Sequence, residues 1–106
     1  MYYKVTAQFK TETAKDFQQK LCDGTIAQQK PDGQEIVDSM NRAVVAENGD
    51  VQWSEVCYCS TPLAHERETV LDKHFENMTT EVIEEYKNYQ GTPFMSYLDE
   101  LIHREE

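Results

Sequence analysis

The segment from residue 36 to residue 59, IVDSMNRAVVAENGDVQWSEVCYC, contains the clearest turn signal in the chain. Its centre is Asn48-Gly49, a pair that tolerates the positive φ angles of the type I′ turn between two antiparallel strands. Valine and other residues that favour strands lie on both sides of this pair. We therefore predict a β-hairpin in which residues 36–47 and 50–59 pair as antiparallel strands.

A two-residue turn would fix which side chains face each other across this hairpin. Arg42 would lie opposite Glu55, and Val44 opposite Trp53. Opposite charges facing each other across a strand pair contribute about 0.2–1 kcal/mol at a surface, but among apolar neighbours they lose hydration. Two interpretations stay open. In the first, the pair lies at the solvent-exposed edge of a half-covered face. In the second, the pair lines a ligand cavity, where Arg42 binds an anion and Glu55 either orients Arg42 or accepts a proton.

The N-terminal part of the chain predicts a strand followed by a helix. In residues 2–9, aromatic or aliphatic side chains recur at every second position, which is typical of a half-buried strand. Residues 13–24 then predict a helix, because Thr13 can cap it, apolar residues follow at helical spacing, and Gly24 suits its end.

Two helices are predicted in the C-terminal half. Thr61 and Pro62 form a typical helix start, since Thr caps the first free amides and Pro needs no amide hydrogen there. Apolar residues then recur at helical spacing as far as Tyr89, and a second cap at residues 78–80 offers a place for a break. Residues 92–106 repeat the Thr-Pro start and predict a final helix.

The predicted order is strand, helix, strand, strand, helix, helix, in a single α+β domain over residues 1–106. It resembles the ferredoxin-like βαββα core with an extra C-terminal helix. A right-handed crossover gives a three-stranded antiparallel sheet in the order 1-3-2, with the helices on one face. Small domains of the dimeric α/β-barrel type cover the other face by packing two sheets together. The resemblance is one of architecture, so it implies a homodimer but no particular activity.

Cysteine and histidine residues do not predict a metal centre. Cys57 and Cys59 are separated by one residue on a predicted strand, whereas zinc sites take paired cysteines from tight turns with longer spacing. His65 and His74 would lie on opposite faces of a helix. We expect no metal and no cofactor, and we expect both cysteines to be reduced. A reactive thiolate at Cys59, near the start of the next helix, is the alternative.

The composition limits the partners and the compartment. The 106 residues carry a net charge of −10 and no Lys/Arg cluster, so we expect neither a nucleic-acid partner nor binding to an anionic membrane. The first residues lack the pattern of a signal peptide, and an odd number of cysteines, three, does not suggest a disulfide framework. Reduced thiols and this start favour a cytoplasmic location.

Two functional hypotheses follow. The first is a homodimeric binding or interaction module, because no Gly-rich phosphate loop, nucleophile elbow or zinc-protease motif is present. The alternative is a small-molecule enzyme of the dimeric α/β-barrel type. Its pocket would lie near the Arg42 and Glu55 face of the hairpin, and Trp53 and His74 would contribute to it. His74 lies on an apolar face, where a packed histidine with one hydrogen bond is the other interpretation.

Overall fold

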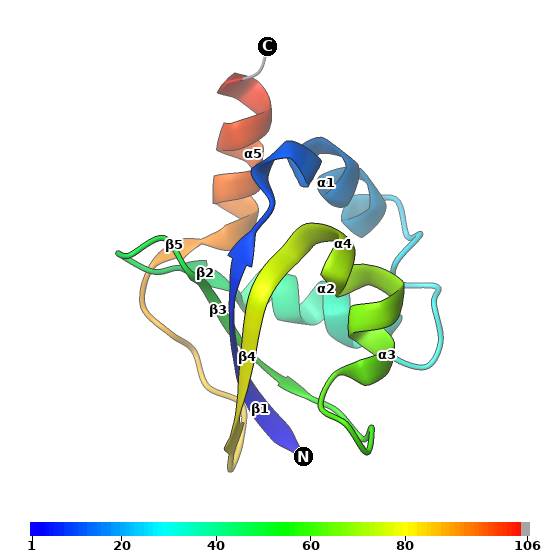
Figure 1. Cartoon of the computed structure of the whole chain (residues 1–106). Helices are drawn as coiled ribbons and strands as arrows, with labels where there is room; N and C mark the ends of the chain where they lie inside the picture. Colours follow the sequence, from blue (N-terminus) through cyan, green and yellow to red (C-terminus); the bar gives the residue numbers. More distant parts are fainter. Residues whose placement is uncertain (105–106) are drawn as a thin grey trace.

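The computed structural model describes residues 1–104 (Figure 1). Its elements in chain order are β1 (Tyr2–Phe9), the 3-10 turn η1 (Thr11–Thr13), α1 (Ala14–Cys22), α2 (Gly33–Arg42), β2 (Val44–Val45), β3 (Val51–Val56), α3 (Ala64–Glu66), the π-helical turn η2 (Arg67–Leu71), α4 (Asp72–His74), β4 (Phe75–Ile83), β5 (Thr92–Pro93) and α5 (Phe94–Arg104). The last two residues of the predicted final helix, Glu105 and Glu106, lie outside the described part.

The α+β class is confirmed, but the sheet is larger than predicted. Its five strands are antiparallel and follow the order β4-β1-β3-β2-β5. The three-stranded ferredoxin-like core is therefore not confirmed, since β4 adds to the free edge of β1 and β5 adds to β2. The predicted neighbours 1-3-2 are present as the central part of this wider sheet.

The core lies between one face of the sheet and the helices (Figure 1). Tyr3, Val5 and Ala7 on β1 are buried, as the alternation of the predicted strand requires. The rings of Phe9, Phe17, Phe75 and Phe94 pack against one another with centroid separations between 5.2 and 6.2 Å. Such aromatic packing joins β1, α1, β4 and α5 into one cluster.

The first half of the predicted hairpin is wrong. Residues 33–42 form α2, whose buried Ile36 and Met40 are four positions apart, the spacing of one helix face. Its first residue is glycine because a Cβ on Gly33 would lie 2.0 Å from the carbonyl oxygen of Ile26. Ile36 and Val37 favour a strand by residue type, but the helical spacing of the buried Ile36 and Met40 outweighs this preference.

The hairpin that does form is short and has a different register. Val44 lies opposite Gln52, and the loop is longer than two residues, since the Ala46 N–H donates to the Asp50 carbonyl oxygen at 2.8 Å. Gly49 has a φ of 94°, which suits the bulged end of a three-residue loop. The predicted Arg42–Glu55 pair across the strands is therefore absent, because Arg42 belongs to α2.

The long C-terminal helix is also wrong. Helical structure covers only residues 64–74, and the chain then enters β4. Residues 79–83, TTEVI, are mostly β-branched, and the free edge of β1 offers them a ladder of hydrogen bonds. Thr61 is not a side-chain cap: Leu63 has a φ of 59°, and the Ala64 N–H donates to the carbonyl oxygen of Thr61. The final helix is confirmed as α5, but its predicted start is wrong, because Thr92 and Pro93 form β5 and the helix begins at Phe94.

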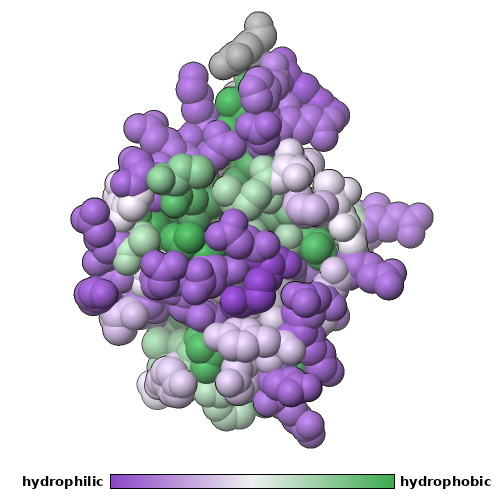
Figure 2. Space-filling model, turned by 180° about the vertical axis from the view of Figure 1, so that it is seen from behind, coloured by the Kyte–Doolittle hydropathy of each residue, from purple (hydrophilic) through white to green (hydrophobic). Residues whose placement is uncertain are grey.

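The surface seen from behind is largely hydrophilic, with separate hydrophobic patches (Figure 2). Four large hydrophobic residues are well exposed: Met1, Tyr58, Val82 and Tyr86. Within residues 1–104, none of the helices combines the length and apolar character needed to cross a membrane.

Candidate functional site

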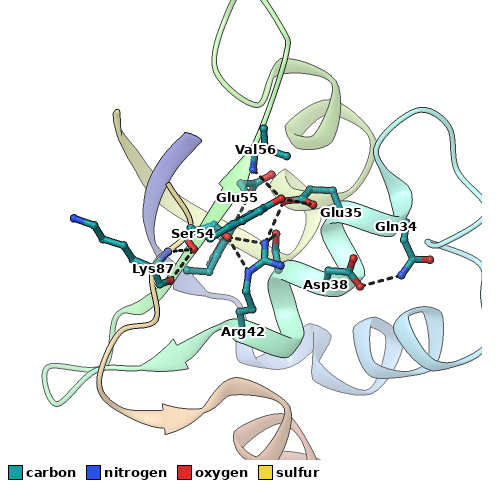
Figure 3. A network of polar contacts seen from close by, with 11 residues as sticks. Gln34, Glu35, Asp38, Arg42, Ser54, Glu55, Val56 and Lys87 are labelled. Atoms are coloured by element: carbon teal, nitrogen blue, oxygen red, sulfur yellow. Dashed lines mark hydrogen bonds and ion pairs between the residues drawn. The ribbon is translucent and has the colours of Figure 1, made fainter. Parts of the chain in front are cut away.

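Part of β3 has no strand on one side, and α2 occupies its place. β2 pairs only with Val51 and Gln52, so the outward main-chain groups of Ser54 and Val56 lie beyond it. The Arg42 guanidinium donates to the Ser54 carbonyl oxygen at 2.8 and 3.3 Å, and the Val56 N–H donates to Glu35 Oε2 at 3.0 Å (Figure 3). Arg42 and Glu35 also form an ion pair at 3.1 Å. Two side chains thus satisfy the edge groups that a strand would pair.

Residues 84–91, here called the strap, run from β4 to β5 and contact the same edge. The Tyr86 hydroxyl donates to both Glu35 oxygens at 3.0 and 3.1 Å, and its ring lies 4.4 Å from the Arg42 guanidinium carbon. Ser54 Oγ donates to the Lys87 carbonyl oxygen at 2.7 Å and accepts from the Lys87 N–H at 3.0 Å. Burial and the bond to Glu35 raise the pKa of Tyr86 to about 12, so the phenol stays a donor.

A cavity of about 300 Å³ opens beside this edge. Pro31, Asp32 and Glu35 line it from the start of α2, residues 56–59 line it from the end of β3, and Glu66 lines it from α3. Residues 31–35 therefore meet residues 56–66, which are more than 20 positions later in the sequence, around one space.

Two buried carboxyl groups lie at this cavity or directly behind it. Glu55 and Glu66 are each 1% exposed. The Trp53 Nε1–H donates to Glu55 Oε1 at 2.6 Å. If both groups were ionised, Glu55 Oε2 and both Glu66 oxygens would have no donor among the described residues. Two ionised carboxylates cannot satisfy each other, because both are acceptors only.

A proton on Glu66 resolves part of this conflict. Burial, followed by the hydrogen bond and charge of Glu55, raises the pKa of Glu66 to about 12. Burial also raises the pKa of Glu55, although the bonds from Glu66 and Trp53 oppose the change. Glu66 is therefore the neutral acid of the pair at pH 7 and donates to Glu55. Its second oxygen is left as an acceptor.

The remaining wall combines one more acceptor with apolar surface. Asp32 Oδ2 lies 2.8 Å from His65 Nδ1, whereas Asp32 Oδ1 is buried without a donor among residues 1–104. The three cysteines are free, and the Cys59 N–H donates to Cys57 Sγ at 3.3 Å. Burial raises the pKa of Cys57, so this thiol is a neutral, weakly polar part of the wall.

The structure brings together only part of the predicted site. Trp53 and Glu55 are hydrogen-bonded, but Arg42 pairs with Glu35 instead of Glu55. His74 lies elsewhere, stacked on Phe17 at 4.2 Å. It lines a second, smaller cavity of about 120 Å³.

His74 is the packed histidine that its sequence position suggested. It is 2% exposed, and its Nδ1 lies 2.8 Å from Thr13 Oγ1. The Thr13 hydroxyl donates to the Lys10 carbonyl oxygen, so His74 Nδ1 is the donor to Thr13. Burial lowers the pKa of His74 to about 4, and the imidazole is neutral at pH 7.

Glu66, Asp32 and Glu35 were not predicted from the sequence as site residues. A signal for Glu66 was present, because it lies three residues after Leu63 and four before Val70, both of which are apolar. An acidic residue at such a position on a helix points toward the core. No protein-family model, curated protein or solved structure matches the chain, so the site is defined by its geometry alone.

Proposed function

We propose that the protein is a binding module for a small molecule, which occupies the cavity between α2, the end of β3 and α3. The observation that carries this proposal is the buried carboxyl of Glu66, a residue that lines the cavity and whose oxygens receive no hydrogen bond from any described residue. Ligand sites are typically concave and largely apolar, with a few fixed polar groups. Cys57, Val56 and Pro31 supply the apolar part here.

A fragment screen on ¹⁵N-labelled protein tests this proposal. We expect hits whose shift changes cluster at Asp32, residues 57–59 and Glu66. Cys59→Trp should fill the cavity and abolish these changes. Cys22→Trp, at an exposed cysteine in α1, is the matched control and should leave them intact. A screen without hits at these residues, or hits that persist in Cys59→Trp, would contradict the proposal.

We also propose that the module is a homodimer in the cytoplasm. The outer edge of β4, over Phe75–Ile83, supports the dimer, since an unpaired edge strand can pair with a second copy about a two-fold axis. Size-exclusion chromatography with light scattering at micromolar concentration measures this directly. A strict monomer would contradict the dimer.

An enzyme of the dimeric α/β-barrel type is the second candidate. It is favoured by Glu66, because a carboxylic acid kept protonated at neutral pH is a proton donor. Cavity ligands from the fragment screen can be incubated with the native protein and with Glu66→Gln, and products followed by mass spectrometry. Turnover by the native protein alone supports catalysis, and no turnover of any ligand contradicts it.

A further inference from the structure

We propose that the cavity recognises an organic cation, namely a primary ammonium or amidinium group on a small apolar body. This inference rests on the proposed binding function and specifies its ligand. Its basis is the set of acceptor oxygens at the cavity wall, from Glu66 and Asp32, that no described residue satisfies.

The hydrogen-bonding groups of the wall show why the ligand must donate. Glu66 is 1% exposed, and neither of its oxygens has a donor among residues 1–104. Asp32 Oδ1 is also buried and receives no hydrogen bond from residues 1–104. Glu35 differs, because Arg42, the Val56 N–H and the Tyr86 hydroxyl already occupy its oxygens. The cavity therefore offers acceptors from Glu66 and Asp32.

The charges around the cavity favour a positive guest. Asp32 and Glu35 line it, together with Glu66, which is neutral in the free protein and is bonded to Glu55. The Arg42 guanidinium is bound to Glu35 and to the Ser54 carbonyl oxygen, and its hydrogen bonds do not go to Glu66 or Asp32. The chain as a whole carries a net charge of −10, which attracts cations to its surface.

The geometry points to an organic cation in place of a metal ion. Among the described residues, no three His, Cys, Asp or Glu side chains are placed to hold one ion. An ammonium group carries three N–H donors, and an amidinium carries a planar fork of donors that fits a carboxylate. The volume of about 300 Å³ lies at the small end of ligand pockets, which suits a body of one ring or a short alkyl chain.

Binding of a cation should release a proton. In the free protein, burial and the facing groups Glu55, Asp32 and Cys57 raise the pKa of Glu66, so its carboxyl is neutral. An ammonium ligand stabilises the carboxylate, and the Glu66 proton passes to the buffer as the ion pair forms. Affinity then rises with pH, by at most tenfold per pH unit for one released proton.

Isothermal titration calorimetry tests the inference with two cationic probes, phenethylamine and benzamidine. Their neutral analogues, 2-phenylethanol and benzamide, are the matched controls. We expect each cation to bind at least tenfold more tightly than its analogue at pH 8. We also expect the measured enthalpy to differ between phosphate and HEPES buffers, because the released proton is taken up by buffers of different ionisation enthalpy.

Variants assign the effect to the proposed groups. Glu66→Gln should weaken cation binding at least tenfold and abolish proton release, and Asp32→Asn should also weaken it. Glu68→Gln removes an exposed charge two residues from Glu66 and should change neither quantity. Circular dichroism confirms that each variant is folded.

The outcomes separate this inference from the function on which it rests. If neutral fragments bind the cavity and the cations bind no better, the cation proposal is wrong and the binding function stands. If no fragment or probe binds there, both are wrong. Cation binding that is unaffected by both Glu66→Gln and Asp32→Asn places the cation elsewhere and overturns the inference.

Discussion

Replacement of Glu66 by glutamine is expected to stabilise the protein at neutral pH. The unfolded chain releases the Glu66 proton near the ordinary pKa of 4.5, whereas burial and Glu55 hold the folded-state pKa far above it. The folded state therefore binds more protons than the unfolded state above pH 4.5. Consequently, the Glu66 contribution to the free energy of unfolding is fully present below pH 4.5 and falls as the pH rises. Glutamine is neutral at every pH and can still donate to Glu55.

The size of the effect follows from the ordinary pKa alone. Keeping a carboxyl of pKa 4.5 protonated at pH 7 costs about 1.4 kcal/mol per pH unit, or about 3.4 kcal/mol in total. At pH 5 the cost is below about 1 kcal/mol. For a chain of this size, the difference at pH 7 corresponds to a Tm about 15 °C higher for Glu66→Gln.

Urea unfolding followed by the fluorescence of Trp53, the only tryptophan, measures this difference from pH 5 to pH 8. The stability gain of Glu66→Gln over the native protein should grow steadily with pH. Glu68→Gln, which removes an exposed charge from the same segment, should show no such growth. A gain that is the same at pH 5 and pH 8, or a Glu66→Gln variant less stable than the native protein at pH 7, would show that Glu66 is not held protonated in the folded state.

Three further outcomes are expected. Tyr86→Phe removes the hydroxyl that donates to Glu35 and should lower the free energy of unfolding by about 1 kcal/mol, measured by urea denaturation; no loss would mean that the strap is not held there. The His74 imidazole, whose pKa is lowered to about 4 by burial, should show no NMR titration above pH 5, and its contribution to stability should decline as the pH falls from 6.5 toward 4. Thr80→Pro removes an N–H on the outer side of β4 and should reduce a light-scattering dimer to a monomer with an unchanged circular dichroism spectrum. A dimer that survives this change does not use the β4 edge.

An element could be predicted from the sequence where the spacing of its apolar residues agrees with the face that it buries in the fold. β1 alternates and is buried on one face, and α5 presents Phe94, Leu98 and Ile102 at helical spacing to the core. Asn48-Gly49 does mark a turn, but the strand before it is only Val44–Val45. Asn48-Gly49 indicates a turn but not the length of the strands on either side of it. It therefore could not exclude a helix over Gly33–Arg42.

β4 could not be predicted because its structure depends on a distant partner. Its apolar residues continue the helical spacing of the preceding segment, yet Thr79 and Thr80 lie opposite Thr6 and Val5 on β1. Local periodicity and pairing with β1 compete there, and the pairing wins. The same competition explains why the strap could not be predicted from the sequence, since it exists only because the helical segment ends at His74.

The error over residues 36–42 also concealed the candidate site. On a strand, Arg42 would face Glu55 and neutralise it. On α2, Arg42 lies seven residues, about two helical turns, after Glu35, and both side chains reach the edge of β3. Glu55 is then left without its predicted partner and pairs with Glu66 and Trp53.

Glu35 connects the edge network to the cavity, and this position gives the strap a role in defining the site. Arg42, the Val56 N–H and Tyr86 all donate to Glu35, which lines the cavity wall. These bonds hold its carboxylate toward the edge of β3. Without Tyr86, one Glu35 oxygen would lose its donor and become a further acceptor near Glu66. The strap therefore limits the free acceptors of the cavity to Glu66 and Asp32, which is the arrangement that a single ammonium group can satisfy.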